Sequence, residues 1–306
     1  MKPIVILTLL YLTLTGCTAT HLAAKDTAKS KINVLDRMTL SYPLKNGIPF
    51  GGISDLAYNP KSGDLYMIGD RGYLYHFKAE LQESIQKLDY RNAYRLTNRH
   101  GKVVRMDSEG LDHNQKNELI ISFERRSQIS KITPQGKLYL NYSLPKKLQN
   151  RSVFKTSNSM FEGLTYHPQH GILTAAEYPI NGQKNTHQTI YGLKGQTWHF
   201  NAEAYPNSAV TALEVMEDNN LLVLERAYNG LTQPLYITLK KLYLDRCNAQ
   251  QQCASEVLIT FDSFQGWSMG NFEGLTQVAP NRYLMVSDNN EHPMIATSLV
   301  YFEVTP

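Results

Sequence analysis

The sequence predicts an all-β fold, a β-propeller built from four-stranded blades. Three observations lead to it: short apolar runs alternate with turn residues from residue 50 onward, no long stretch has helical periodicity, and one hairpin pattern recurs five times. The 306 residues, of which 42% are hydrophobic and 19% charged, suffice for a sizeable core and exclude a disordered chain. No apolar run approaches the length of a membrane-spanning helix, which excludes a polytopic membrane protein.

The first 31 residues have the pattern of an export and anchoring segment. Lys2 precedes an apolar run at residues 4–14, which is too short to span a bilayer and is typical of a secretory signal. Residues 14–17 (LTGC) resemble the lipobox of bacterial lipoproteins, in which cleavage before the cysteine is followed by its acylation. We therefore expect a signal peptide at 1–16, then a lipidated Cys17 with a flexible tether at 17–31, and a membrane as partner. An ordinary signal peptide with a chance cysteine is the alternative.

Residue Thr18 bears on the destination of such a lipoprotein. By resemblance to Gram-negative lipoproteins, threonine rather than aspartate after the cysteine favours the outer membrane. The remaining residues, 32–306, are expected to form a single domain. Because an exported protein meets an oxidising environment, Cys247 and Cys253 are expected to close a small disulfide loop rather than bind a metal.

Each repeat begins with an acid beside a short apolar strand. These first acids recur at intervals of 52 to 59 residues, as Asp55, Glu109, Glu162, Glu214 and Glu273. A second, more apolar strand follows and also ends in an acid, namely Asp70, Glu124, Glu177, Glu225 or Asp288. The midpoints between the two acids fall in turn-forming segments at 60–63, 114–117, 168–171, 218–220 and 279–281. Five antiparallel hairpins are therefore predicted, with the two acids of each facing one another.

The rest of each repeat completes a blade and, at the ends of the chain, closes the ring. Two further alternating runs lie between successive hairpins, which gives the strand content of a propeller blade. After Asp288 only residues 298–304 remain for another strand, and residues 33–42 can supply the outer strand that the last blade lacks. We expect five blades, with six as the alternative if a long interval conceals a degenerate one.

The ten acids are the candidate functional residues. The first strand of each blade lines the central channel, so the acids are expected to surround one channel mouth, where like charges require compensation. Calcium is the expected cofactor, because it accepts six to eight oxygen ligands in irregular geometry. The alternative is a packing role, in which the acids bond to backbone N–H groups of the next blade or pair with arginine.

Three arginines, Arg71, Arg125 and Arg226, directly follow second acids. They are candidates to hold a phosphate or carboxylate bidentately, with outward-facing surface positions as the alternative. A net charge of +4, with no run of more than two consecutive cations, does not favour nucleic-acid binding. Two acid-free basic stretches, roughly 91–105 and 146–155, are expected to be solvated, with contact to anionic lipid headgroups as the alternative.

At these hairpins the chain resembles the bacterial phytase-like ("esterase-like activity of phytase") propeller family. The resemblance covers roughly residues 47–305 and is carried by segments 51–58 (GGISDLAY), 69–72 (GDRG), 107–111 (DSEGL), 161–165 (FEGLT), 221–228 (LLVLERAY), 271–275 (NFEGL) and 286–290 (VSDNN). It implies a propeller and calcium-dependent hydrolysis of phosphate esters, with the ten acids as ligands and the three arginines as anion holders.

The leading hypothesis is thus a membrane-anchored, metal-dependent hydrolase of phosphate or carboxylic esters. A non-catalytic lipoprotein that binds or assembles protein partners is the first alternative, and a gluconolactonase-like lactonase is the second. Ser287, which precedes Asp288, has no identifiable histidine partner in the sequence, so any hydrolysis is expected to be metal-assisted.

Overall fold

A computed structural model describes residues 31–104, 107–230, 232–265, 270–289 and 295–305. The expected signal peptide and the lipidation site at Cys17 lie outside these residues. Within them, no helix is both long enough and apolar enough to cross a membrane.

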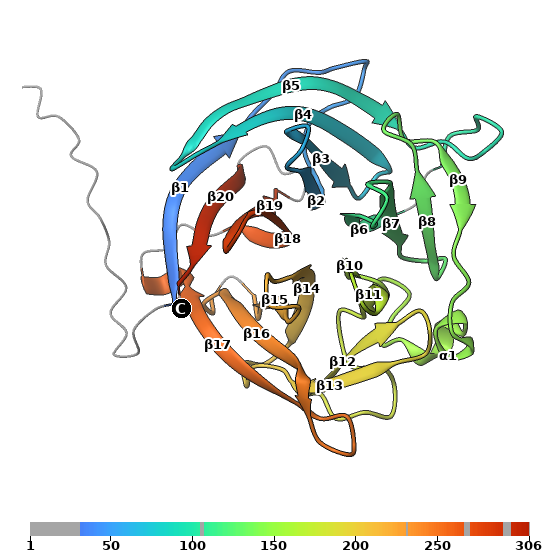
Figure 1. The fold of residues 1–306 in the computed structure, drawn as a ribbon, viewed down its shortest axis with the longest axis vertical. Helices are drawn as coiled ribbons and strands as arrows, with labels where there is room; N and C mark the ends of the chain where they lie inside the picture. Colours follow the sequence, from blue (N-terminus) through green and yellow to red (C-terminus); the bar gives the residue numbers. More distant parts are fainter. Residues whose placement is uncertain (1–30, 105–106, 231, 266–269, 290–294, 306) are drawn as a thin grey trace, which may run out of the picture.

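The described residues form five four-stranded antiparallel sheets arranged as the blades of a ring (Figure 1). Blade 1 contains β2 (Ile53–Asn59), β3 (Asp64–Gly69), β4 (Tyr73–Leu81) and β5 (Ile85–Arg95). Blade 2 contains β6 (Ser108–His113), β7 (Leu119–Phe123), β8 (Gln128–Ile132) and β9 (Leu138–Asn141). Blade 3 contains β10 (Gly163–His167), β11 (Gly171–Ala175), β12 (His187–Gly192) and β13 (Thr197–Asn201).

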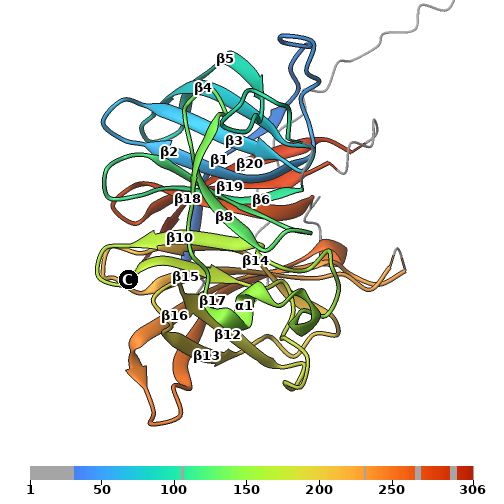
Figure 2. The same cartoon turned by 90° about the vertical axis from the view of Figure 1, so that its right-hand side faces the viewer.

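Blade 4 contains β14 (Ser208–Val215), β15 (Leu221–Ala227), β16 (Tyr236–Cys247) and β17 (Cys253–Asp262). Blade 5 contains β18 (Asn271–Ala279), β19 (Arg282–Asp288), β20 (Thr297–Val304) and β1 (Ile32–Leu40). The helices described are short: α1 (Lys146–Gln149) and the 3₁₀ turns η1 (Arg151–Val153) and η2 (Ser263–Gln265). Figure 2 shows the ring from the side.

The N-terminal strand closes the ring. Strand β1 pairs antiparallel with β20, from Ile32 opposite Val304 to Leu40 opposite Thr297, and becomes the outer strand of blade 5. This confirms both the expected closure and the count of five blades over six. Strands β2, β6, β10, β14 and β18 are innermost, and each contacts the inner strands of its two neighbours.

Second strands are largely apolar because each is covered on both faces by neighbouring blades. All five residues of β7 are buried. Ile121 and Phe123 pack in a cluster with Ile68 of blade 1, whereas Ile120 packs with Leu164 of blade 3. The core of the protein is therefore a series of layers between blades, and this layering holds the inner strands around the ring axis.

The repeated Glu-Gly-Leu triplet has its steric explanation in this layering. A Cβ atom built on Gly274 would lie 2.7 Å from the Asp55 Cα and 2.9 Å from Leu56 Cδ2. The equivalent atom on Gly163 would lie 2.6 Å from Leu213 Cγ of the next blade. Glycine thus lets the inner strand approach the buried leucine of its neighbour.

Replacing Gly274 with alanine is accordingly expected to lower the free energy of unfolding by about 1–3 kcal/mol, because the new methyl group meets backbone that cannot yield locally. Ala212 occupies the corresponding place in blade 4, and Ala212→Gly is expected to cost no more than about 1 kcal/mol. Urea unfolding measures both. Equal stability of Gly274→Ala and the wild type would show that the inner strands are free to separate.

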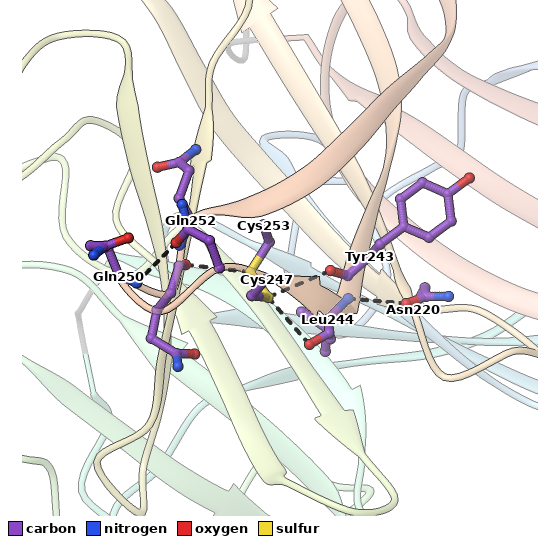
Figure 3. The surroundings of a disulfide bond; sticks show 9 residues. Asn220, Tyr243, Leu244, Cys247, Gln250, Gln252 and Cys253 are labelled. Atoms are coloured by element: carbon purple, nitrogen blue, oxygen red, sulfur yellow. Dashed lines mark hydrogen bonds between the residues drawn. A yellow bond between two sulfur atoms is a disulfide. The ribbon is translucent and has the colours of Figure 1, made fainter.

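The expected disulfide is confirmed. Cys247 and Cys253 are bonded and close the hairpin between β16 and β17 (Figure 3). At the tip of this hairpin the carbonyl of Gln251 accepts a 2.7 Å hydrogen bond from the His199 N–H of β13. The disulfide therefore stabilises a loop that joins the outer parts of blades 3 and 4.

Candidate functional site

The acids of the repeat occupy different places relative to the buried leucine of each inner strand. Glu109, Glu162 and Glu273 lie two residues before Leu111, Leu164 and Leu275. Asp55 directly precedes Leu56, and Glu214 directly follows Leu213. Aligning the repeats on the leucine rather than on the acid would have separated these three classes in the sequence.

The predicted hairpin register, with the two acids of each blade facing one another, is wrong. Asp55 lies opposite Ile68, Glu214 opposite Leu222, and Asp288 opposite Asn271. Irregularities in the inner ladders of blades 1, 2, 4 and 5 shift the pairing near the start of the inner strand. In blade 3 the ladder is regular and its last pair at this end is Gly163 opposite Ala175.

Asp55 and Glu214 bond to backbone N–H groups. The Asp55 carboxylate accepts from Leu56 at 2.8 Å, from Leu111 of blade 2 at 2.7 Å and from Leu275 of blade 5 at 3.1 Å. Glu214 accepts from Val215 at 2.8 Å and from the Gln277 N–H of blade 5. Burial raises the pKa of both carboxyls well above the usual value, although these bonds act in the opposite direction. Both acids thus have the packing role that the sequence left open.

Two further acids bear on this division. Asp112, which the repeat pattern missed, accepts from the Tyr166 N–H of blade 3 at 2.6 Å and so links blades in the same way as Asp55. Glu225 lies 3.3 Å from the ammonium of Lys240, whose side chain is 2% exposed. That ammonium also contacts Glu203 at 2.8 Å. The charge of Glu225 is therefore neutralised within blade 4.

The remaining acids gather at one end of the inner and second strands. We call them the carboxylate ring, and they are Asp70, Asp107, Glu109, Glu124, Glu162, Glu177, Glu273 and Asp288. Their effects on one another's pKa values show that the members lie close together. Burial has the largest effect and raises the pKa values of Glu109 and Glu162, and the charges of Glu124 and Glu273 raise both values further. Asp107, a member that the repeat pattern missed, is among the charges that raise the pKa of Glu109.

Two members of the ring, Glu124 and Glu273, retain protons well above the usual carboxyl range. Burial raises the pKa of Glu124 to about 7 and that of Glu273 to about 8. The Glu124 and Glu162 side chains hydrogen-bond to one another, which requires a proton on one of the two carboxyls. Blades 2 and 3 therefore hold an acid pair that shares a proton when nothing else compensates its charge.

Arg226 occupies the part of the ring where blade 4 lacks a glutamate. Thr211 stands two residues before Leu213, and its hydroxyl donates to the Phe272 carbonyl instead. The Arg226 guanidinium donates to Glu273 at 2.7 Å and to Glu177 at 2.8 Å, with its side chain 18% exposed. Among the residues that the structure describes, it is the cation that ion-pairs with two carboxylates of the ring.

The other candidate anion holders are more exposed. Arg125 lies 2.6 Å from Asp107 and donates to Asn158. Arg71 is exposed, and its charge lowers the pKa of Asp70 against the larger effect of burial. A cation that the sequence did not single out, Lys155, lies 3.9 Å over the Tyr178 ring and lowers the pKa of Glu177, which burial raises.

A cleft of about 390 Å³ lies beside Glu177. Lys155, Tyr178, Tyr205 and Asn207 are among the residues that line it. Because Tyr178 directly follows Glu177 and its hydroxyl hydrogen-bonds to that carboxylate, the cleft adjoins the carboxylate ring. It offers a cationic, aromatic and amide lining next to the acids.

The ring can be tested for its fit to calcium by its donor atoms. In the described parts of the chain, no three His, Cys, Asp or Glu side chains converge closely enough to form a metal site by themselves. The donors are carboxylate oxygens, which suit a hard cation, and the Glu124–Glu162 pair must lose its shared proton to become a dianionic ligand. The donors therefore match calcium in their chemistry, while their spacing in this structure does not by itself form a closed site.

Comparisons with known proteins give a fold likeness and a family. Solved structures that match include the PQQ-bound aldose sugar dehydrogenase from Streptomyces coelicolor (10% identity, 90% of this chain, 98% of that chain, TM-score 0.41). A luciferin-regenerating enzyme also matches, with 9% identity over 83% of this chain and 92% of that chain and a TM-score of 0.44. A streptogramin B lyase matches with 9% identity over 88% of this chain and 97% of that chain and a TM-score of 0.41. Likeness at this level carries no information on chemistry. No curated protein matches the chain.

The family model described as "Phytase-like: Esterase-like activity of phytase" matches residues 48–291, which contain β2 to β19 and the whole carboxylate ring. This match covers most of the chain, and the chain belongs to the phytase-like family.

Proposed function

We propose that this phytase-like propeller is a calcium-dependent hydrolase of phosphate or carboxylic esters, acting at the carboxylate ring. The observation that carries the proposal is the excess of carboxylates over cations at one end of the inner strands. Arg226 ion-pairs with Glu177 and Glu273, whereas burial and neighbouring charges raise the pKa values of Glu109, Glu124 and Glu162, and Glu124 shares a proton with Glu162. Acids held in this way are expected to exchange their protons for a divalent cation.

Glu109, Glu124 and Glu162 are the residues that would hold calcium, with Asp70 and Asp107 beside them. A bound calcium ion would neutralise the anionic group of an ester and polarise it for attack by water. The chain itself supplies the setting: Lys155 and the neighbouring cleft bind and orient the substrate anion, and Arg226 keeps Glu177 and Glu273 in place. The hydroxyl of Ser287 is buried and accepts the Ser298 N–H, which favours metal-assisted attack over attack by Ser287.

Calorimetric titration of the full chain with calcium tests the proposal. Glu109→Gln with Glu162→Gln is expected to weaken calcium binding at least tenfold and, because like charges are removed, to leave the calcium-free protein as stable as the wild type or more so. Glu80→Gln with Glu217→Gln is the matched control, since both side chains are exposed and neither belongs to the ring. Loss of stability without any calcium binding would mean that the ring only holds blades together, as in the non-catalytic alternative.

Hydrolysis is assayed on phosphate esters, carboxylic esters and lactones, each with calcium and with EDTA. Calcium-dependent turnover of a phosphate ester, reduced by Lys155→Gln mainly through a higher KM, is the expected result. Turnover of lactones alone would favour the lactonase hypothesis. Calcium binding without turnover of any of these would leave a binding or assembly platform.

The location remains a proposal of the same kind. We infer that the protein is exported and anchored through a lipidated Cys17 in the outer membrane of a Gram-negative bacterium, from the resemblance of residues 14–17 to a lipobox. Radioactive palmitate should label the wild type in such a host and should not label Cys17→Ser.

A further inference from the structure

A surface cleft of about 510 Å³ lies on the outer part of blade 2, and no residue of the carboxylate ring lines it. One wall is the loop around residues 97–103, in which Thr97 pairs with Val103 and also with Lys137, the residue before β9. The other wall is formed by β8 and β9. The cleft therefore lies where the connection from blade 1 folds over the outer strands of blade 2.

The charge of this cleft is unlike that of the other clefts. Arg99 and Arg126 line it, together with His100, and no carboxylate does. The three other clefts described each contain at least one Asp or Glu, such as Asp64, Glu203 or Asp218. Across the described residues, neither Arg99 nor Arg126 forms an ion pair with a carboxylate, so both guanidinium groups keep their charge for a ligand.

The neutral polar groups of the cleft also present donors. The Asn98 Oδ1 accepts the His100 N–H and the Lys102 N–H, both at 3.0 Å, which leaves its NH₂ for another partner. The Asn141 Oδ1 accepts from Ser130 at 2.8 Å and from Gln128 at 3.3 Å, with the same consequence. The His100 Nε2 accepts from Arg99 Nε at 3.0 Å, so its Nδ1 carries the hydrogen of the neutral ring.

The rim of the cleft is apolar. Tyr139 and Leu140, which line the cleft, are 44% and 42% exposed. Exposed hydrophobic side chains gathered at a concave surface are typical of a binding site. A ligand that satisfies both parts has a multiply charged anionic head for the donors and an organic portion for the rim.

We propose that this cleft binds the phosphate group of an organic phosphate monoester. Two guanidinium forks, together with amide and imidazole N–H groups, offer enough donors to bond to several oxygens of a phosphate. A single carboxylate would leave some of these donors without a partner. The group can come from a soluble ester or from a lipid headgroup, and the chemistry of recognition is the same for both. The site does not depend on calcium and is independent of the function proposed for the carboxylate ring.

The test uses the full chain in EDTA, so that no metal at the carboxylate ring contributes to binding. One arm titrates inorganic phosphate and glycerol 3-phosphate by calorimetry. A second arm compares flotation with phosphatidic acid vesicles and with phosphatidylcholine vesicles. We expect at least tenfold weaker binding in Arg99→Gln with Arg126→Gln, and unchanged binding in Arg151→Gln with Arg246→Gln, which removes the same charge from exposed positions elsewhere.

Leu140→Glu provides an independent variant, because it places a carboxylate at the exposed rim and is expected to repel the anion without disturbing the core. If the wild type binds soluble phosphates and these variants do not, a soluble ester is the ligand. If the wild type binds only the phosphatidic acid vesicles and the variants lose that binding, a lipid headgroup is the ligand. Absence of binding in both arms, or an equal loss in the Arg151 and Arg246 control, would overturn the proposal.

Discussion

Replacing Arg226 with methionine is expected to lower the free energy of unfolding by about 3–5 kcal/mol at pH 8, the scale observed when one partner of a buried ion pair is removed. The side chain is 18% exposed and ion-pairs with Glu177 and Glu273, which are 11% and 17% exposed. Without the guanidinium, two carboxylates of the ring face one another uncompensated. Urea unfolding of the calcium-free protein measures the effect.

The penalty of Arg226→Met should shrink at pH 5, because Glu177 and Glu273 can then take up protons. Adding Glu273→Gln to the Arg226 variant should restore part of the stability for the same reason. Arg282→Met is the control: Arg282 pairs with Glu83 at the surface, where ion pairs contribute little, and only a small change is expected. A loss of equal size at pH 5 and pH 8 would show that Arg226 acts by packing rather than by charge.

The second large expected effect is the dependence of stability on pH and calcium. The pKa values of Glu124 and Glu273 in the folded protein, about 7 and about 8, lie above the ordinary value of 4.5. At pH values between 4.5 and these raised values, the folded state therefore binds more protons than the unfolded state. Its stability falls as the pH rises through this range to the folded pKa values. Each proton bound in excess contributes about 1.4 kcal/mol per pH unit.

The direction is best measured between pH 6.5 and 8. Burial lowers the pKa of His113 from its ordinary value of 6.5 to about 4. Below pH 6.5 this histidine therefore makes the stability fall as the pH falls, which is opposite to the effect of the carboxyls. Above pH 6.5 the carboxyls dominate. In EDTA the melting temperature should fall from pH 6.5 to pH 8.

Calcium should reverse this trend, since it competes with the protons of the carboxylate ring and stabilises the state that binds it. The increase in melting temperature on adding calcium should thus be larger at pH 8 than at pH 6.5. Stability that rises with pH in EDTA would contradict the raised pKa values. A pH-independent effect of calcium would place its binding site outside the ring.

The sequence by itself determined the architecture of this protein. The spacing of the hairpins, the turn residues between their strands and the apolar second strands were sufficient to predict five blades and closure by the N-terminal strand. These features are local, because a strand buried on both faces must be apolar wherever its neighbours come from. The disulfide was predictable for the same reason, since only five residues separate the two cysteines.

Only the tertiary structure decided which acids hold the blades together and which form the carboxylate ring. Asp55 and Glu225 look like Glu109 and Glu177 in the sequence, yet Asp55 bonds to N–H groups of blades 2 and 5, and Glu225 to Lys240. Arg226 joins Glu177 to Glu273 across blades 3, 4 and 5. The charge state of a carboxylate depends on burial and on partners that the fold brings from distant repeats, so identical local patterns acquire different chemistry once the ring closes.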